Sequence, residues 1–426
     1  MNNFLTLTVI LLAFVVFLGF FNEKVTKFTY EISLMLFSVI IGGILLLLKL
    51  FLNADTSVAQ ILNNINFSSL ESFLMEGVLC FMLFAGSCHM RLLDFKKHAK
   101  IISLLAIGAT FLGAVFYGVL FYGVSLLLGL NLSLPVCLMF GSITAPTDPI
   151  AATSILKKFN LPTNIGFIIE GESLLNDGVG VALFVCFSGM VSAQENGGFF
   201  AVMAKELLGA VLVGIVITAI CFPIFKRTMD TNRQIFTSLL AVATAYLACE
   251  IFGFSGAIAS VVCGVLFSAL RNWNEQKGET LDLEQFDIFW GILDNLLNSV
   301  LYVMLGLSFI QILQMPYVLI LSVMAIIINL IGRSGSVAIS SLFVKTLPDG
   351  YNKSSFTKLL TWGGLRGGLC VALAMSTQEL VSNDIYYIIL GGTYAIVFFT
   401  TIVQGMTMPA VYRRIEDNLK KIHKGQ

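Results

Sequence analysis

The sequence has little charge. Of its 426 residues, only 12% are Asp, Glu, Lys or Arg, whereas 57% are hydrophobic. A typical soluble domain carries about 25% charged residues, so this composition excludes a soluble protein of ordinary type. Histidine is also scarce, with three in the whole chain, and none of the eight cysteines stands in a CxxC or CxxH spacing. We therefore expect the cysteines to pack as small hydrophobic side chains, without disulfides or a cysteine–histidine metal site.

Nucleotide and haem signatures are missing as well. The sequence contains no phosphate loop, no dinucleotide-binding fingerprint and no haem-attachment motif. We expect no cofactor, no nucleic-acid partner and no enzymatic activity. The apolar composition leaves a polytopic membrane protein, with the lipid bilayer as its surroundings, as the expected class.

Long apolar runs are the main feature that the sequence does have. They are continuous rather than alternating, which favours transmembrane helices over the strands of a β-barrel. We predict an all-α polytopic membrane protein with about thirteen transmembrane helices, at residues 4–21, 31–52, 70–90, 101–129, 133–156, 164–191, 199–225, 234–251, 255–270, 287–313, 316–344, 357–377 and 384–411.

Lysine and arginine indicate the orientation. They follow the odd-numbered runs and are nearly absent after the even-numbered ones. Because positively charged loops stay in the cytoplasm, the pattern predicts an N-terminus outside and a C-terminus inside. The N-terminus lacks the basic segment and cleavage site of a signal peptide, so we expect the first run to remain as a helix. Residues 1–411 then form a single transmembrane domain, and 412–426 form a short cytoplasmic tail.

Proline and glycine interrupt two of the predicted helices. Pro146 and Pro149 lie deep inside the fifth, and the stretch 362–368, Trp-Gly-Gly-Leu-Arg-Gly-Gly, lies inside the twelfth. Each proline removes an amide donor and clashes with the preceding turn, so the helix should break there. With 199–225 as a linker helix, the breaks hold matching positions in two six-helix halves, about 4–191 and 234–411.

Matching breaks are typical of inverted-repeat transporters, in which two broken helices cross at mid-membrane beside the binding site. The alternative is chance, since glycine and proline are both common in membrane helices.

The sixth predicted helix carries the most unusual polar stretch, at 168–178. Glu170, Glu172, Asn176 and Asp177 lie where hydrocarbon is expected. An acid at mid-membrane costs roughly 2.5–3.5 kcal/mol, so it needs a partner or a water-filled cavity. At about 100° per residue, Glu172 and Asn176 share one face, while Glu170, Ser173 and Asp177 form the adjacent stripe. Asp177 lies nearest to the middle of the run.

The charged residues inside the predicted helices indicate which ions the protein could bind. Six ionisable side chains lie inside the predicted helices near these features, namely Asp148, Glu170, Glu172, Asp177, Arg333 and Arg366. Arginine stays charged, so the two arginines can neutralise two acids but cannot cycle protons. One or two carboxylates remain uncompensated, and burial favours their protonated form. A small cation could replace that proton, bound by carboxylate, hydroxyl and backbone oxygen atoms. Competition between a proton and a cation for one acid is the minimal antiporter.

Three motifs at these residues resemble those of the sodium–proton exchanger family. They are Thr-Asp-Pro at 147–149, Glu-Ser-x-x-Asn-Asp at 172–177 and Gly-Gly-Leu-Arg-Gly at 363–367, in the family's order. The resemblance covers essentially the whole membrane domain. It implies a homodimer built from dimerisation and transport domains, with elevator-type alternating access. The chain lacks the long regulatory tail of the animal exchangers, which implies a prokaryotic inner-membrane antiporter.

The resemblance also implies an ion site. Asp177 would bind both Na⁺ and the proton, and Ser173 and Thr147 would contribute oxygen ligands. From their positions at and beside the proline break, we add Asp148 and Asn176 to the predicted ion- and proton-binding group. Asn-Asp at 176–177, in place of Asp-Asp, resembles the electroneutral branch of the family, which implies one cation exchanged for one proton.

The remaining charges have structural roles by the same resemblance. Glu172 would pair with Arg333, because 329–335 resembles the family's arginine-bearing eleventh helix, and Arg366 would brace the second broken helix. Glu170 completes this charge network, with the alternative that it carries a second proton. The sequence leaves Na⁺, Li⁺ and K⁺ open as the transported ion.

Other functions compete with exchange. A cation channel or uniporter is the main alternative, although one asymmetric pocket with internal ion pairs favours a carrier. The Gly-x-Ser-Gly stretch at 253–256 resembles a rhomboid-protease motif, but the histidines His89, His98 and His423 lie near helix ends or in the tail. A serine nucleophile needs a nearby base, so we interpret this stretch as a turn that separates two short helices. Asp148 and Asp177 as an aspartyl-protease pair is disfavoured by the proline-broken helix.

Overall fold

A computed structural model describes residues 3–51, 78–88, 92–148, 163–192, 199–228, 230–276, 283–312, 318–344, 347 and 351–424. Every regular element within them is a helix. In chain order these are α1 (Asn3–Phe21), η1 (Asn22–Thr26), α2 (Tyr30–Phe51), α5 (Leu79–Cys88), α6 (Leu92–Ser103), η3 (Leu104–Ala109), α7 (Thr110–Leu127), α8 (Leu134–Ile143), α10 (Thr163–Ser192), α11 (Phe199–Arg227), α12 (Thr231–Phe252), α13 (Gly256–Gln276), α14 (Glu284–Ile312), α15 (Val318–Leu342), α16 (Lys353–Trp362), α17 (Gly368–Met375), η5 (Ser376–Glu379), α18 (Asn383–Phe398), η6 (Phe399–Gln404) and α19 (Gly405–Lys424).

The prediction of an all-helical membrane protein is confirmed. Within the described residues, eight helices are long and apolar enough to cross a membrane, and three shorter apolar helices accompany them. Each of the thirteen predicted ranges contains a helix. The count of thirteen membrane crossings and the inverted symmetry of the two halves remain predictions. The last helix runs on without interruption to Lys424, so residues 412–424 of the predicted tail continue α19.

The predicted interruptions are present. The Gly-x-Ser-Gly stretch separates α12 from α13, and Gly253 ends α12 with φ 67°, a left-handed conformation that suits glycine at a helix end. The fifth predicted helix stops at Ile143, and the chain from Thr144 to Asp148 leaves the helix. Its expected second half, from Pro149 to 156, lies outside the described residues. The twelfth predicted helix divides into α16 and α17, with residues 363–367 between them.

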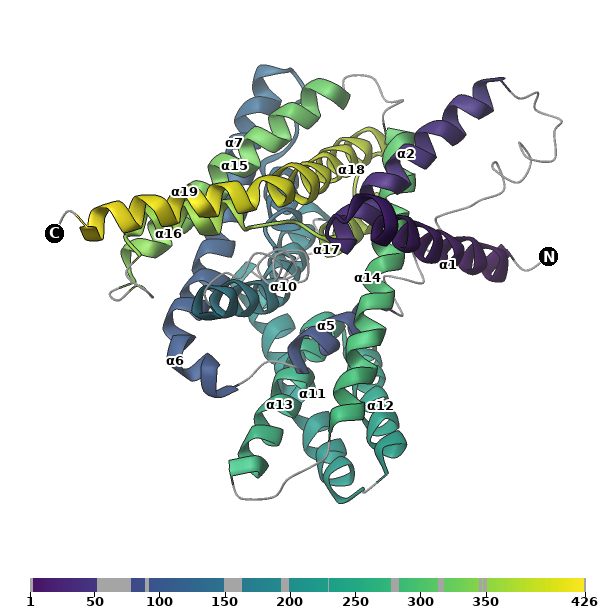
Figure 1. The fold of residues 1–426 in the computed structure, drawn as a ribbon, viewed down its shortest axis with the longest axis vertical. Helices are drawn as coiled ribbons and strands as arrows, with labels where there is room; N and C mark the ends of the chain where they lie inside the picture. Colours follow the sequence, from purple (N-terminus) through teal and green to yellow (C-terminus); the bar gives the residue numbers. More distant parts are fainter. Residues whose placement is uncertain are drawn as a thin grey trace.

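We divide the helices into two bundles by their contacts. In Figure 1, α14 runs from α11, α12 and α13 in the lower part of the view up to α2 at the upper right. We call the first the site bundle, because it contains both broken segments. It comprises α6, η3, α7, α8, α10, α15, α16, α17, α18, η6 and α19. The second, which we call the companion bundle, comprises α1, α2, α5, α11, α12, α13 and α14. Each bundle contains helices from both halves of the chain, so the halves interlock rather than forming separate domains.

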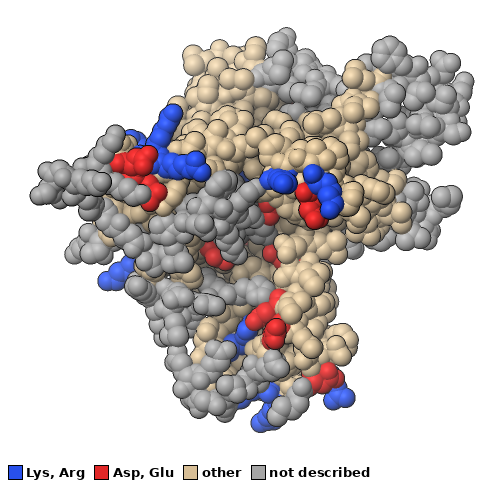
Figure 2. All heavy atoms as spheres, in the orientation of Figure 1, with Lys and Arg blue, Asp and Glu red and all other residues tan. Residues whose placement is uncertain are grey.

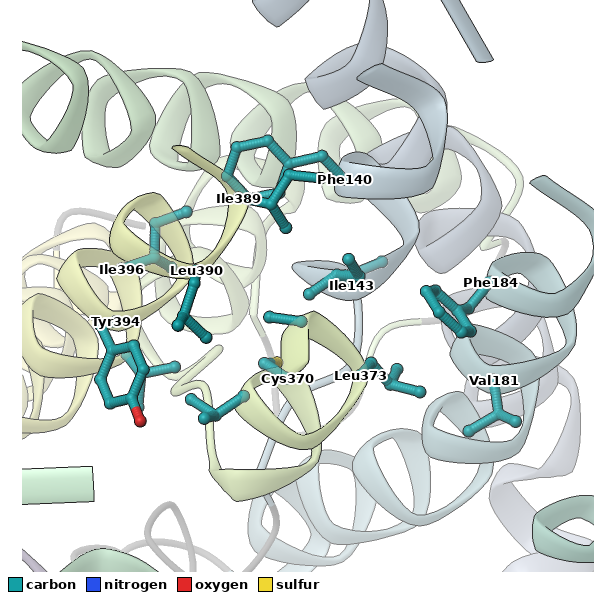
Figure 3. Close-up of a cluster of buried hydrophobic side chains, with 14 of the residues drawn as sticks. Phe140, Ile143, Val181, Phe184, Cys370, Leu373, Ile389, Leu390, Tyr394 and Ile396 are labelled. Carbon is teal, nitrogen blue, oxygen red and sulfur yellow. The ribbon is translucent and has the colours of Figure 1, made fainter. Parts of the chain in front are cut away.

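The core behind the breaks is apolar (Figure 3). Short helix α17 lies at its centre, and its Cys370 and Leu373 point between α8, α10 and α18. These neighbours contribute the remaining labelled side chains, Phe140, Ile143, Val181, Phe184, Ile389, Leu390, Tyr394 and Ile396. Large apolar side chains are also exposed on the outside of both bundles, as expected for a surface that faces lipid.

Close packing of α2 and α14 predicts a stability defect. A Cβ at Gly306 of α14 would lie 2.8 Å from the Met35 carbonyl and 3.0 Å from the Val39 amide nitrogen. Gly306→Val should therefore force the helices apart, cost about 1–3 kcal/mol and lower the melting temperature in detergent. Gly43→Ala is the control, because nothing lies within 4 Å of its Cβ position. Equal melting temperatures for both variants and the wild type would contradict this packing.

Candidate functional site

The two broken segments meet. The Asp148 amide donates a hydrogen bond of 2.7 Å to the Leu365 carbonyl, which joins the end of the first break to the middle of the second. Gly367 allows the close approach, since a side chain there would overlap the Asp148 carboxylate. Gly180 of α10 likewise lies against the Pro146 ring. The structure therefore brings two segments more than 200 residues apart in sequence into one site.

Arg366 joins the two broken segments at the place where they meet, which we call the crossing. Its guanidinium donates to the carbonyl of Ala145 and, at 2.7 Å, to that of Pro146. It also donates to Asn329 Oδ1 of α15 at 3.3 Å. Both carbonyls belong to peptide groups that the first break removed from the helical hydrogen-bond pattern. Arg366 therefore braces the first broken segment as well as its own, which extends the role predicted from the sequence.

Side-chain hydroxyls satisfy the backbone of the second break. The Arg366 amide donates to Thr400 Oγ1 at 3.1 Å, and the Arg366 carbonyl accepts from Thr401 Oγ1 at 3.2 Å. Both threonines are fully buried in η6. A membrane interior offers little water, so peptide groups outside a regular helix need such partners.

Asn176 bridges α10 to the first break. Its Oδ1 accepts from the Thr147 amide at 3.2 Å, and its Nδ2 donates to Thr147 Oγ1 at 2.7 Å. The Thr147 and Ser173 hydroxyl oxygens are 2.8 Å apart and share a hydrogen bond. Asn176 Nδ2 also lies 3.5 Å from Glu172 Oε1. These contacts fix the Thr147 side chain and backbone to one face of α10 without adding charge.

Glu172 and Arg333 form a buried ion pair. Two parallel hydrogen bonds of 2.7 and 2.9 Å join the guanidinium to both carboxylate oxygens. The two side chains are only 4% and 1% exposed. Arg333 also donates to the Leu360 carbonyl of α16 at 3.4 Å. The pair therefore connects α10, α15 and α16. It also neutralises one acid of the site with one base.

Asp148 and Asp177 lie in a different setting. The Asp148 carboxylate accepts a hydrogen bond from the Tyr302 hydroxyl of α14. Among the residues that the structure describes, no hydrogen bond or ion pair is formed by the half-buried Asp177 carboxylate. Asp148 and Arg366 are the charged groups that act on it. Asp177 is thus a cavity-lining acid of α10 that, among the described residues, has no direct positive partner.

Both acids line one cavity between the bundles. It has a volume of about 70 Å³, and its walls also include Thr147, Asp294 and Asn298. A water molecule needs roughly 10–15 Å³ by this measure, so the cavity has room for a cation with a few water molecules. Its described lining includes three carboxylates and no lysine or arginine. Figure 2 shows acidic side chains in the recess near the centre of the molecule.

The predicted site residues fall into three groups. Thr147, Asp148 and Asp177 line the cavity. Ser173 and Asn176 lie behind it as supports of Thr147. The third group comprises Glu172 and Arg333, which bind each other, together with Arg366, which binds backbone carbonyls of the first break.

Glu170 lies apart from the cavity. It shares the helical stripe of Asp177, but its side chain is exposed and does not line the cavity. Residues on one helical stripe can lie at different depths, because seven residues span about 10 Å along a helix. Glu170 therefore lies two turns from Asp177, toward the N-terminal end of α10.

Sequence reasoning missed the contribution of α14. Tyr302, Asp294 and Asn298 all reach the site from this helix, and Asn298 Nδ2 donates to Asp294 Oδ1 at 2.9 Å. Asp294 was detectable as an acid inside the predicted span 287–313. Because that span has no break, nothing in its sequence placed it beside the crossing.

Known proteins share both sequence and fold with this chain. The family model described as sodium/hydrogen exchanger, transmembrane, matches residues 10–414. The Na(+)/H(+) antiporter NhaP of Pseudomonas aeruginosa is 29% identical over 371 residues, which cover 85% of this chain and 84% of that protein. The Na(+)/H(+) antiporter NhaH of Halobacillus aidingensis is 31% identical over 294 residues, which cover 67% and 70%.

A solved structure has the same fold. The sodium proton antiporter MjNhaP1 from Methanocaldococcus jannaschii superposes with a TM-score of 0.76 at 19% identity. The superposition covers 97% of this chain and 99% of that one.

The buried ion pair predicts coupled stability losses. Glu172→Ala and Arg333→Ala should each lower the melting temperature in detergent, because removing one partner of a buried pair costs about 3–5 kcal/mol by leaving the other charge unpaired. The double variant should lose less than the sum of the two single losses. Strictly additive losses would show that the two side chains are not energetically coupled.

Proposed function

The chain belongs to the sodium/hydrogen exchanger family, and from this premise we propose that it exchanges a monovalent cation for a proton across a membrane. Na⁺ is the proposed cation, because the relatives described above carry that ion in their names. The observation that carries the proposal is the Asp177 carboxylate, which lines the cavity without an ion-pair partner among the described residues. Such a carboxylate needs a proton or a cation to neutralise it.

The cavity favours a cation over other solutes. Three carboxylates contribute to its wall, and the described lining has no positive side chain to repel a cation. Sodium is a hard cation that prefers oxygen ligands, as the other hard cations do. Asp177 and the Thr147 hydroxyl lie at the wall, and the Ser173 hydroxyl lies directly behind Thr147. We propose that these three residues supply oxygen ligands, with Asp148 adding negative charge.

Proton coupling follows from competition for Asp177. The Glu172 carboxylate is held by Arg333 in two hydrogen bonds, so we assign it a structural role and no part in the proton cycle. Asn176 cannot titrate. Asp177 is then neutralised once in each direction, by a cation in one and by a proton in the other. The site then crosses the membrane with the same net charge in both directions, which supports an electroneutral exchange of one cation for one proton.

The packing supports alternating access. The crossing belongs to the site bundle, and the cavity also has walls from α5 and α14 of the companion bundle. We propose that the site bundle moves as a unit against the companion bundle, as an elevator, and exposes the cavity to each side in turn. The alternation of positive loops supports an outer N-terminus and a cytoplasmic C-terminus in a prokaryotic inner membrane. Homodimer formation is proposed on family resemblance.

The ion-binding role of Asp177 makes a direct prediction. Asp177→Asn should abolish Na⁺-dependent proton exchange in proteoliposomes, because the amide cannot exchange a proton for a cation, while the protein still folds and inserts. Glu170→Gln is the matched control, since it neutralises an exposed acid of the same helix and should keep exchange within about twofold of the wild type. Wild-type exchange by Asp177→Asn would rule out the assignment.

Electroneutrality makes a second prediction. A Na⁺ gradient imposed across a solid-supported membrane should produce no sustained transport current, because no net charge crosses. Proton flux should also be insensitive to a potassium–valinomycin clamp. If a second acid cycled, one charge would move and each 100 mV would contribute about 2.3 kcal/mol. A sustained current that disappears in Asp294→Asn or Glu170→Gln would contradict the one-for-one count and identify the second carrier.

A further inference from the structure

Helix α14 contacts both broken segments through two consecutive residues. The Tyr302 hydroxyl donates a hydrogen bond to the Asp148 carboxylate at the end of the first break. Its neighbour Leu301 lies against Gly368, the first residue after the second break, where any side chain would overlap it. Tyr302 is fully buried and Leu301 is 8% exposed. One turn of α14 thus packs against both broken segments at the place where they meet.

The rest of α14 is fixed to the companion bundle. Gly306 packs directly on the α2 backbone at Met35. At the other end, Trp290 Nε1 donates to Ser238 Oγ of α12 at 3.1 Å, and both side chains are fully buried. Arg271 of α13 forms two hydrogen bonds with Asp287 of α14, at 2.8 and 3.0 Å. Tyr302 therefore belongs to the companion bundle, while Asp148 belongs to the site bundle.

The other hydrogen bonds of the site have a different arrangement. Those made by Asn176, Arg333 and Arg366 join segments of the site bundle to one another. They can persist when that bundle moves as a unit. The Tyr302–Asp148 bond joins the two bundles, so relative movement of the bundles must break it.

We propose that Tyr302 is a positioning residue that latches the site bundle in the conformation described here, through its hydrogen bond to Asp148. This inference rests on the proposed function, because it assumes two conformations that alternate during transport. In the latched state the phenol orients the Asp148 carboxylate at the cavity wall. Release of the latch lets Asp148 leave with the site bundle, and the phenol stays on α14.

The latch has a measurable energetic consequence. A hydrogen bond to a charged group in a buried site stabilises the state that contains it, and the size of this effect corresponds to about a tenfold change in an equilibrium constant. Tyr302→Phe removes only the hydroxyl and keeps the ring that packs on the crossing. The ratio of the latched conformation to the other should therefore fall about tenfold.

Double electron–electron resonance can measure this ratio. Spin labels at Leu127→Cys on α7 and Ile251→Cys on α12 report the distance between the bundles, since these positions are 86% and 72% exposed. All eight native cysteines are buried, so labelling is directed to the introduced ones. Tyr117→Phe is the matched control. That tyrosine is 2% exposed, and its hydroxyl has no hydrogen-bond partner in the described part of the chain.

The expected result is a lower latched fraction in Tyr302→Phe and an unchanged distance distribution in Tyr117→Phe. A distance distribution in Tyr302→Phe that equals that of the wild type would overturn the latch. This includes the case in which the wild type and Tyr302→Phe both show a single distance. Na⁺–proton exchange by the wild type is measured in parallel in proteoliposomes. Absence of that exchange would refute the proposed function, whereas normal exchange with an unchanged distance distribution would refute the latch alone.

Discussion

Peptide groups inside a membrane need hydrogen-bond partners, and two broken helices leave several of them without the helical ones. Each unsatisfied group costs several kcal/mol where water is absent. In this chain, the two broken segments satisfy this requirement by forming hydrogen bonds with each other. The Asp148 amide pairs with the Leu365 carbonyl, and the Arg366 guanidinium binds the Ala145 and Pro146 carbonyls. Neighbouring helices add Asn176, Thr400 and Thr401.

This use of side chains determines the charge of the site. Arg366 is directed at carbonyl dipoles, and Arg333 is committed to Glu172. Within the part of the chain that the structure describes, neither guanidinium forms an ion pair with Asp177 at the cavity wall. The negative charge of the cavity is therefore a consequence of how the breaks are stabilised. A cavity with room for water and surplus negative charge suits a small cation or a proton, which is the competition that an antiporter requires.

Much of this arrangement follows from local sequence. Pro146, together with the glycines at 363–367, predicts where helices end, because proline and glycine change the backbone directly. Helical spacing alone places Glu172 and Asn176 on one face of α10 and Ser173 and Asp177 on the adjacent stripe.

Contacts between distant helices followed no such local rule. Tyr302 and Asp294 lie in an unbroken apolar helix, and only the packing of α14 against the two broken segments brings Asp294 to the cavity and Tyr302 to Asp148. The depth of Glu170 could not be predicted for a related reason, since helical spacing gives the angle of a residue around the helix but not its distance from the cavity. The sequence resemblance supplied the pairing of Glu172 with Arg333, which periodicity could not provide because 161 residues separate the two.

The most direct test of this account measures the protons released when Na⁺ binds to the purified protein. In a weakly buffered solution near neutral pH, with a pH indicator, addition of NaCl should release up to one proton per chain. Asp177→Asn should release none. Choline chloride at equal ionic strength is the control. The apparent affinity for Na⁺ should also weaken as the pH falls, because both ions compete for one carboxylate. Sodium binding that is independent of pH and releases no proton would contradict it.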